Sequence, residues 1–292
     1  VAALKRNSLW ITLLSPDRID ADILRAVLRR HITVISLMHV TDSSGRRHIS
    51  DTLAEVEGRA AITVSAGLLA DGVYGKGILL GGVAGIVPCE VVVIGAGIAG
   101  IAAAKGASGA GATVRVFDDN PSKLRQLTDS CSGMVIPSSL HREVFLRAVA
   151  TADIIINTLP SPYCGKARLS ADDLSTLKKE AIIIDTSGGD AFPSIRNTDL
   201  TPAPDKPLYQ TGHRCFTNVC NAVPRTASMA ISNCLVPLIE KIVTAPTIID
   251  SVRMEQSIKA GLVAIGGQIV NRDAAAASGL NFVDSSIFLH LS

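Results

Sequence analysis

Short apolar runs alternate with amphipathic segments through the middle of this chain. Runs such as 91–94 and 181–184 are apolar at every position, which is typical of strands buried on both faces of a parallel sheet. The segments between them carry apolar residues at helical spacing. Strands are predicted at 91–94, 114–118, 152–159 and 181–185, and helices at 98–107, 122–127 and 171–177. This alternation predicts an α/β fold with a doubly wound parallel sheet.

A smaller strand–helix–strand unit is predicted at the start of the chain. Apolar runs at 8–14 and 32–38 flank the segment 20–30, in which Leu24 and Val27 fall on one helical face. Two long helices are predicted at 51–70 and 225–243, and the residues that follow show no strong strand pattern.

Composition narrows the class of protein. The chain has 292 residues, 47% of them hydrophobic, and a formal net charge of +2, which is too small to argue for nucleic-acid binding. Its six cysteines form no Cys-x-x-Cys pair, so we expect reduced thiols and no metal site. No stretch as long as a membrane span lacks charged residues, and the first residues lack the order of a signal peptide. We therefore expect a cytoplasmic protein that binds neither nucleic acid nor membrane.

A glycine-rich turn follows the run 91–94. Gly95, Gly97 and Gly100 form the pattern G-x-G-x-x-G, in which the glycines permit the turn, the approach of a pyrophosphate and close helix packing. The helix after them offers its N–H groups to the phosphates. Asp118 ends the next strand, where an acid binds ribose hydroxyls and disfavours the 2′-phosphate of NADP. The pattern predicts NAD as cofactor, with NADP less favoured; a turn needed only for packing is the alternative.

Three segments resemble the alanine dehydrogenase and transhydrogenase domain I family: 51–61, 75–127 and 215–239. The resemblance implies two lobes with the cofactor in a cleft. It places a Rossmann domain at 53–224, and a smaller lobe for substrate binding or oligomerisation at 1–52 and 225–292. It also implies a homodimer or larger homo-oligomer.

The same resemblance implies a set of cofactor contacts. Gly95, Gly97 and Gly100 would surround the pyrophosphate, Asp118 the adenosine ribose, Lys123 and Ser138 the adenine, Leu159 and Pro160 the strand end beside the ribose, and Asn218 the nicotinamide.

The catalytic residues of that family are not carried over. Its catalytic histidine falls at Leu14, which cannot exchange a proton, and a cofactor-binding serine falls at Ala54. Its substrate-binding arginine and lysine have no equivalent in the printed sequence. Asp190 lies near the place of the family's catalytic aspartate without aligning with it, and His213 precedes the predicted nicotinamide segment. Either could supply a proton, and Asn218 could orient the nicotinamide or the substrate.

These observations support an NAD(P)-dependent oxidoreductase with a recast active site. Its expected small-molecule substrate is an imine or an amino or oxo acid other than alanine, in a specialised biosynthetic pathway. Two alternatives stay open. One is an NAD-binding pseudoenzyme or regulatory subunit without turnover, and the other is a redox-neutral enzyme that recycles bound NAD.

Overall fold

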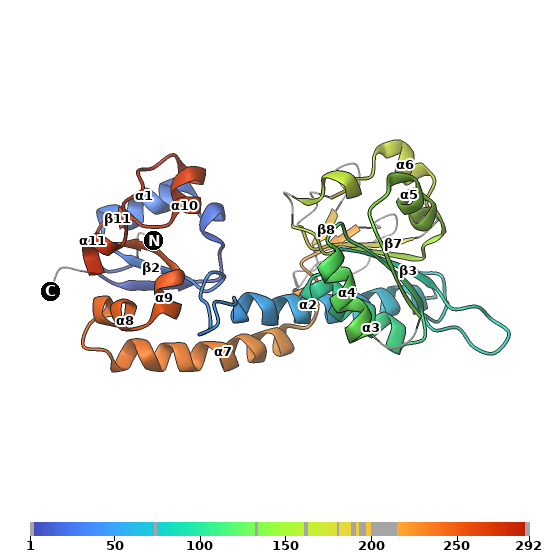
Figure 1. Ribbon diagram of the computed structural model, residues 1–292, viewed down its shortest axis with the longest axis horizontal. Helices are drawn as coiled ribbons and strands as arrows, with labels where there is room; N and C mark the ends of the chain where they lie inside the picture. Colours follow the sequence, from blue (N-terminus) through green and yellow to red (C-terminus); the bar gives the residue numbers. More distant parts are fainter. Residues whose placement is uncertain are drawn as a thin grey trace. The chain divides into compact units, whose positions relative to one another are not determined.

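The computed structural model describes residues 3–72, 75–131, 134–160, 163–179, 181–187, 191–192, 197–199 and 215–289 (Figure 1). They form two compact units, one within residues 1–52 and 229–292 and the other within residues 53–228. Two long helices contribute residues to both units, α2 (His48–Ala70) and α7 (Pro224–Thr244).

The central unit, within 53–228, is built on a seven-stranded sheet in the order β5-β4-β3-β6-β7-β9-β8. All of its strand pairs are parallel. The strands are β3 (Glu90–Ile94), β4 (Thr113–Phe117), β5 (Val135–Ser138), β6 (Ile154–Asn157), β7 (Ile182–Asp185), β8 (Asn197–Asp199) and β9 (Cys215–Thr217). The predicted parallel α/β sheet is confirmed.

Both faces of this sheet are covered, because successive side chains of a strand point to opposite faces. Val91 and Val93 of β3 belong to one hydrophobic core, and Val92 and Ile94 belong to the other. Helices α2, α3 (Ile98–Gly109) and α4 (Pro121–Ser130) cover the first face, and α5 (Arg142–Thr151) and α6 (Ala171–Ser175) cover the second (Figure 1). The unit also contains the short helices η3 (Gly165–Ala167) and η4 (Val219–Ala222).

Strand β5 and helix α5 were not predicted. The edge strand reads Val-Ile-Pro-Ser, with Ile136 and Pro137 exposed, so it lacks the buried apolar run that marks its neighbours. Proline is confined to edge strands because it cannot donate a ladder hydrogen bond. Helix α5 buries Phe145, Ala148 and Val149, which are spaced at three and four residues.

Helices α2 and α3 approach each other closely at Gly58. A Cβ atom at Gly58 would lie 2.1 Å from the carbonyl oxygen of Ala99, in the first turn of α3, and 2.9 Å from the Cβ of Ala102. Glycine therefore allows the two backbones to touch. This contact attaches α2 to the helix that begins at the glycine-rich turn.

The other unit is built on a four-stranded sheet in the order β1-β2-β10-β11. Strands β1 (Leu9–Thr12) and β2 (Thr33–Ser36) are parallel and are joined by α1 (Ala21–Arg29), as predicted for the start of the chain. The side chain of Asp20 caps α1 by accepting from two backbone N–H groups. The remaining elements are η1 (Pro16–Arg18), α8 (Ile248–Met254), α9 (Gln256–Ala260), β10 (Leu262–Ile265), β11 (Gln268–Ile269), α10 (Arg272–Ser278) and α11 (Ser286–Leu289).

Strands β10 and β11 were missed in the sequence. They form a hairpin around Gly266 and Gly267, which both have positive φ, and β10 runs antiparallel to β2. Four apolar residues and a two-residue partner give too short a pattern to separate a strand from its Ala- and Gly-rich surroundings. Pairing with the buried strand β2 decides their conformation.

Helix α7 is an exception to the expectation, drawn from the sequence, that no segment of the chain resembles a membrane span. By length and composition alone, it is the one helix among the described residues that could cross a membrane, although only 11% of its most apolar window is buried. It carries exposed apolar side chains at Met229, Val236 and Val243. Many helices that never enter a bilayer pass the same test, so this is weak evidence.

Replacing Gly58 by alanine should destabilise the central unit by roughly 1–3 kcal/mol, since the new Cβ has to push α2 away from Ala99. Gly67 of the same helix is the matched control, because nothing lies within 4 Å of its Cβ position. Gly67→Ala should raise stability by up to about 1 kcal/mol through helix propensity. Denaturant unfolding of the two variants measures both effects, and equal stabilities would contradict the close α2–α3 contact.

Candidate functional site

The glycine-rich turn connects β3 to α3 at the carboxyl end of the sheet. Gly95 has φ +99°, a conformation that side chains with a Cβ rarely adopt, and a Cβ there would lie 2.6 Å from Thr158 Oγ1. The N–H of Gly95 donates to the carbonyl of Phe117 at 2.7 Å. The turn therefore packs between the ends of β4 and β6.

The other two glycines of the motif have different surroundings. A Cβ at Gly100 would lie 1.8 Å from the carbonyl oxygen of Gly95, so only glycine lets α3 pack against the turn. A Cβ at Gly97, by contrast, would meet nothing within 4 Å. Gly97 caps α3 with extended backbone, so its open side lies at the helix N-terminus, where unpaired N–H groups bind phosphate. This free space beside α3 fits a pyrophosphate group.

Asp118 lies directly after β4 and is 5% exposed. Its Oδ2 accepts from the N–H of Ala96 at 2.8 Å, inside the glycine turn, and its Oδ1 accepts from the N–H of Asn120 at 2.8 Å. Each carboxylate oxygen has a further lone pair, so these bonds leave capacity for ribose hydroxyls. Asp118 therefore fixes the turn and stays the predicted ribose ligand.

The remaining predicted adenosine contacts lie on neighbouring strand ends. Ser138, half-buried, ends β5 and its carbonyl accepts from Asp118 N–H at 3.1 Å. Leu159, also half-buried, follows β6, and its Cδ2 would lie 3.1 Å from a Cβ at Gly95. Lys123 is exposed in the first turn of α4, and Pro160 is exposed after β6. The structure brings Ser138 and Leu159 against the glycine turn and its acid, but it shows no such contact for Lys123 or Pro160 among the described residues.

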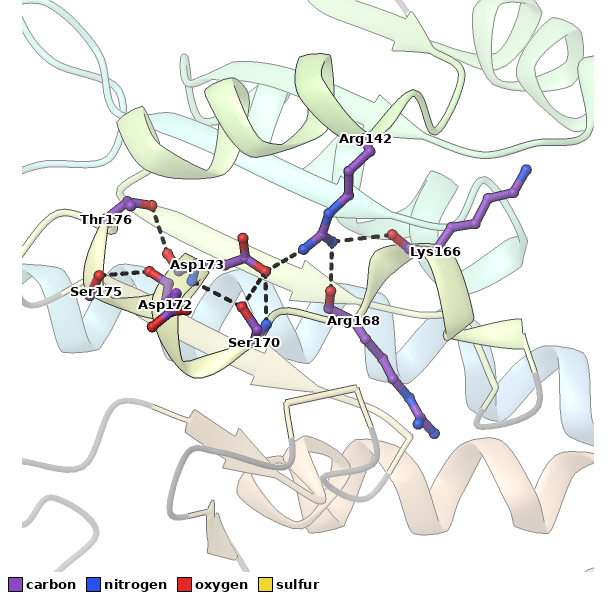
Figure 2. A network of polar contacts seen from close by, with 8 residues as sticks. All are labelled: Arg142, Lys166, Arg168, Ser170, Asp172, Asp173, Ser175 and Thr176. Carbon is purple, nitrogen blue, oxygen red and sulfur yellow. Dashed lines mark hydrogen bonds and ion pairs between the residues drawn. The ribbon is translucent and has the colours of Figure 1, made fainter.

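A polar network holds the segment that follows Pro160. The guanidinium of Arg142, in α5, donates to the carbonyl of Arg168 at 2.6 Å and pairs with Asp173 (Figure 2). Asp173 also forms a capping box with Ser170 at the start of α6. The hydrogen bond from Ser170 N–H contributes most to lowering the pKa of Asp173. The side chains of Lys166 and Arg168 point away from this network, so their charged ends lie outside it (Figure 2).

The end of β7 carries a buried carboxylate. Asp185 is 0% exposed and accepts from Asn157 Nδ2 at 2.8 Å, Ser187 N–H at 2.9 Å, Ser187 Oγ at 2.7 Å and Ala191 N–H at 3.1 Å. Four donors compensate a buried negative charge. Asp185 therefore holds the turn after β7 and joins it to the end of β6.

Asn218 follows β9, the strand that pairs with β7. It has φ 56° and ψ 41°, a left-handed conformation that asparagine tolerates, and its side chain is exposed. The other two predicted catalytic residues, Asp190 and His213, lie outside the described residues. The predicted role of Asn218 at the nicotinamide stays a prediction, as do the roles of that pair.

A carboxyl group that sequence analysis missed lies on α2. Burial, together with the charge of Asp185, raises the pKa of Glu57 to about 7. Burial, together with the charge of Glu57, raises the pKa of Cys220 in η4 to about 11. The spacing of residues in the sequence could have indicated Glu57. It shares a helical face with Ala61 and Val64, four and seven residues further on, and both of these are buried. A carboxylate on an otherwise apolar helix face is unusual.

The comparisons with known proteins agree with this geometry. The family model described as "Alanine dehydrogenase/PNT, C-terminal domain" matches residues 61–272. The alanine dehydrogenase of Mycolicibacterium smegmatis is 32% identical over 274 residues, which cover 90% of this chain and 71% of that protein. The chain belongs to the alanine dehydrogenase/PNT family.

Other relatives support the same family. The alanine dehydrogenase of Bacillus subtilis is 30% identical over 273 residues, covering 90% of this chain and 70% of that protein. A solved structure of L-alanine dehydrogenase superimposes with a TM-score of 0.80 at 24% identity, covering 94% of this chain and 76% of that one. A transhydrogenase from Sinorhizobium meliloti gives 0.70 at 16% identity, covering 92% and 77%. The fold, and the relation to oxidoreductases that bind a nicotinamide nucleotide, are thereby established.

The structure describes both positions at which the resemblance implies that a functional side chain of the family is replaced. Leu14, in the place of the family's histidine, lies just after β1 and is 44% exposed. Ala54, in the place of its serine, lies in the part of α2 that belongs to the central unit. Neither side chain can donate a proton or accept a hydrogen bond.

The part of the chain that the structure describes contains neither a cluster of metal-ligating side chains nor a disulfide bond. No group of three or more His, Cys, Asp or Glu side chains there could hold a metal ion. All six cysteines are free, three of them buried.

Gly97→Ala should weaken dinucleotide binding by about tenfold or more, which is about 1.4 kcal/mol, because the methyl group fills the space beside the α3 N-terminus. The fold should persist, since the φ of −78° at Gly97 suits alanine. Gly109→Ala, at the other end of α3, also has open space and is the matched control. Calorimetric titration with NAD measures the effect, and equal affinities in both variants would argue against a pyrophosphate at Gly97.

The raised pKa of Glu57 predicts a pH-dependent stability. Between about pH 4.5 and about pH 7 the unfolded state releases the proton of Glu57 while the folded state keeps it, so stability falls as pH rises. The loss should reach roughly 3 kcal/mol, and Glu57→Gln should abolish this part of it. Denaturant unfolding at the two ends of the window tests this, with Glu55→Gln, an exposed glutamate paired with Arg59, as control. Parallel pH curves for wild type and Glu57→Gln would contradict a Glu57 carboxyl that keeps its proton in the folded state.

Proposed function

We propose that this chain is an NAD(P)-dependent oxidoreductase that reduces or oxidises an imine, or an amino or oxo acid other than alanine. One observation carries the proposal. Open space at Gly97, beside the N-terminus of α3, adjoins a buried acid, Asp118, that is bonded to the same glycine turn. A pyrophosphate at the turn and a ribose at the acid use these two features together.

NAD is the proposed form of the cofactor. The predicted ribose ligand Asp118 and its chain neighbour Asp119 are both carboxylates, and negative charges beside the ribose would oppose the 2′-phosphate of NADP. Asp119 pairs with Lys166 at 2.7 Å, but both side chains are largely exposed, at 47% and 71%. Such a pair is screened by water and contributes little. The balance of charge therefore favours NAD.

The nicotinamide would supply or accept a hydride, which is chemistry that no side chain provides. The chain has only to orient the ring and the substrate. We propose Asn218 for this task, because its exposed amide lies directly after the carboxyl end of β9. Its left-handed backbone ends the extended conformation of the strand. The proton donors predicted from sequence are Asp190 and His213.

A substrate other than alanine is supported by Leu14. The family's histidine is predicted at this place, and an exposed leucine offers neither a proton nor a hydrogen bond.

The exposed apolar side chains of α7 support the expected homo-oligomer, and light scattering from the purified chain checks its mass.

Titration with NAD and NADP, followed by turnover assays, tests the function. NAD should bind more tightly than NADP, and Asp118→Ala should lose about 1–3 kcal/mol of NAD affinity with the hydrogen bonds to the charged carboxylate. NADH should be oxidised in the presence of at least one member of a panel of cyclic imines and of 2-oxo acids with ammonium. Failure of both nucleotides to bind would overturn the cofactor. Binding without oxidation by any panel member would favour a protein without turnover.

A further inference from the structure

The order of the strands separates two halves of the dinucleotide crevice. In an open α/β sheet, the ligand lies across the carboxyl ends of the strands at the point where the strand order reverses. Asp118 follows β4, on one side of β3, and β6, β7 and β9 lie in that order on the other side. A dinucleotide whose ribose lies at Asp118 therefore places its nicotinamide toward the ends of β6, β7 and β9.

Helix α2 brings Glu57 to this second half. Gly58, the next residue, has its Cβ position 2.1 Å from the carbonyl of Ala99, in the first turn of α3. The backbone at Glu57 is thus held against the helix that begins at Gly97. The carboxyl group itself lies close enough to Asp185, at the end of β7, and to Cys220, in η4, for charge to act between them.

Two carboxyl groups in this cluster have opposite environments. Asp185 accepts four hydrogen bonds and has no exposed surface, which suits a carboxylate that positions the β7 turn. Glu57 is partly exposed and has no hydrogen bond or ion pair with any other described residue. Its oxygens are therefore available to a ligand. Pairs of acids with such different surroundings divide into one charged and one proton-carrying member.

We propose that Glu57 is the acid–base residue of the active site, exchanging a proton with the substrate beside the nicotinamide. This role rests on the proposed function. In the reducing direction, the carbon of a C=N or C=O bond receives a hydride from NADH and the nitrogen or oxygen receives the proton of Glu57. The substrate is reduced, the dinucleotide is oxidised, and Glu57 remains as a carboxylate that regains a proton from water.

The charges around Glu57 fit this task. The charge of Asp185, at the end of β7, acts on Glu57, and Glu57 in turn acts on the thiol of Cys220 in η4, whose raised pKa of about 11 keeps it neutral at physiological pH. Within α2, Glu55 is paired with Arg59 instead. Burial and the charge of Asp185 raise the pKa of Glu57 to about 7, where an acid–base group works most effectively.

Binding of the two redox forms tests the role without turnover. The oxidised nicotinamide is a cation and the reduced ring is neutral, so deprotonation of Glu57 should strengthen binding of NAD⁺ relative to NADH. We expect the ratio of the two affinities to change about tenfold between about pH 5.5 and about pH 8.5 in the wild type. Glu57→Gln should show a flat ratio, and Glu55→Gln should behave as the wild type does.

The outcomes separate the two proposals. If neither nucleotide binds to the wild type, the proposed function falls, and the role of Glu57 with it. If both bind and the ratio changes equally in wild type and Glu57→Gln, only the role of Glu57 is overturned. A third test applies if a panel substrate supports oxidation of NADH. Glu57→Gln should then lower kcat by about 100-fold or more and remove the limb of the pH–rate profile near 7. Glu57→Asp should restore part of the rate. An unchanged profile in Glu57→Gln would also refute the role.

Discussion

The architecture of the central unit depends on the contact between α3 and the turn before it. The Cα of Gly100 lies so close to the carbonyl of Gly95 that a side chain cannot be placed there, and Thr158 closes the other side of the turn. Asp118 adds a hydrogen bond from β4 to the same loop. The ends of three strands thereby meet at one turn, and the Cβ position of Gly97, at the N-terminus of α3, has open space around it. Unpaired N–H groups at such a helix end are suited to a phosphate, which is the contact predicted for Gly97.

Helix α2 is attached to the same region of the fold. Because Gly58 touches the first turn of α3, the position of α2 is tied to the glycine turn and not only to the apolar core. Glu57, the residue before Gly58, lies close enough to Asp185 at the end of β7 for charge to act between them. Under the proposed function, the two halves of the site would differ in chemistry: backbone N–H groups and the hydrogen-bonded Asp118 at one end, and Glu57, whose pKa is raised, at the other.

Membership of the alanine dehydrogenase/PNT family accounts for the fold and for its relation to nicotinamide-dependent oxidoreductases. The resemblance implies that the family's histidine falls at Leu14, so family membership alone does not name a proton-transferring group in this chain. In nicotinamide-dependent enzymes the dinucleotide carries the hydride chemistry and the protein supplies position and protons, so this fold is compatible with a different proton-transferring group.

The sequence by itself determined the parallel sheet, the glycine turn and the acid after β4, because buried strands and glycines leave local patterns of spacing and residue type. It did not determine β10 and β11, whose short apolar runs become strands only by pairing with β2. It also did not single out Glu57. The raised pKa of that carboxyl depends on burial and on Asp185, which is more than a hundred residues away along the chain and comes close only when the strands are ordered in the sheet. Residue type and spacing are local properties, whereas burial and charge are set by which distant segments the fold brings together.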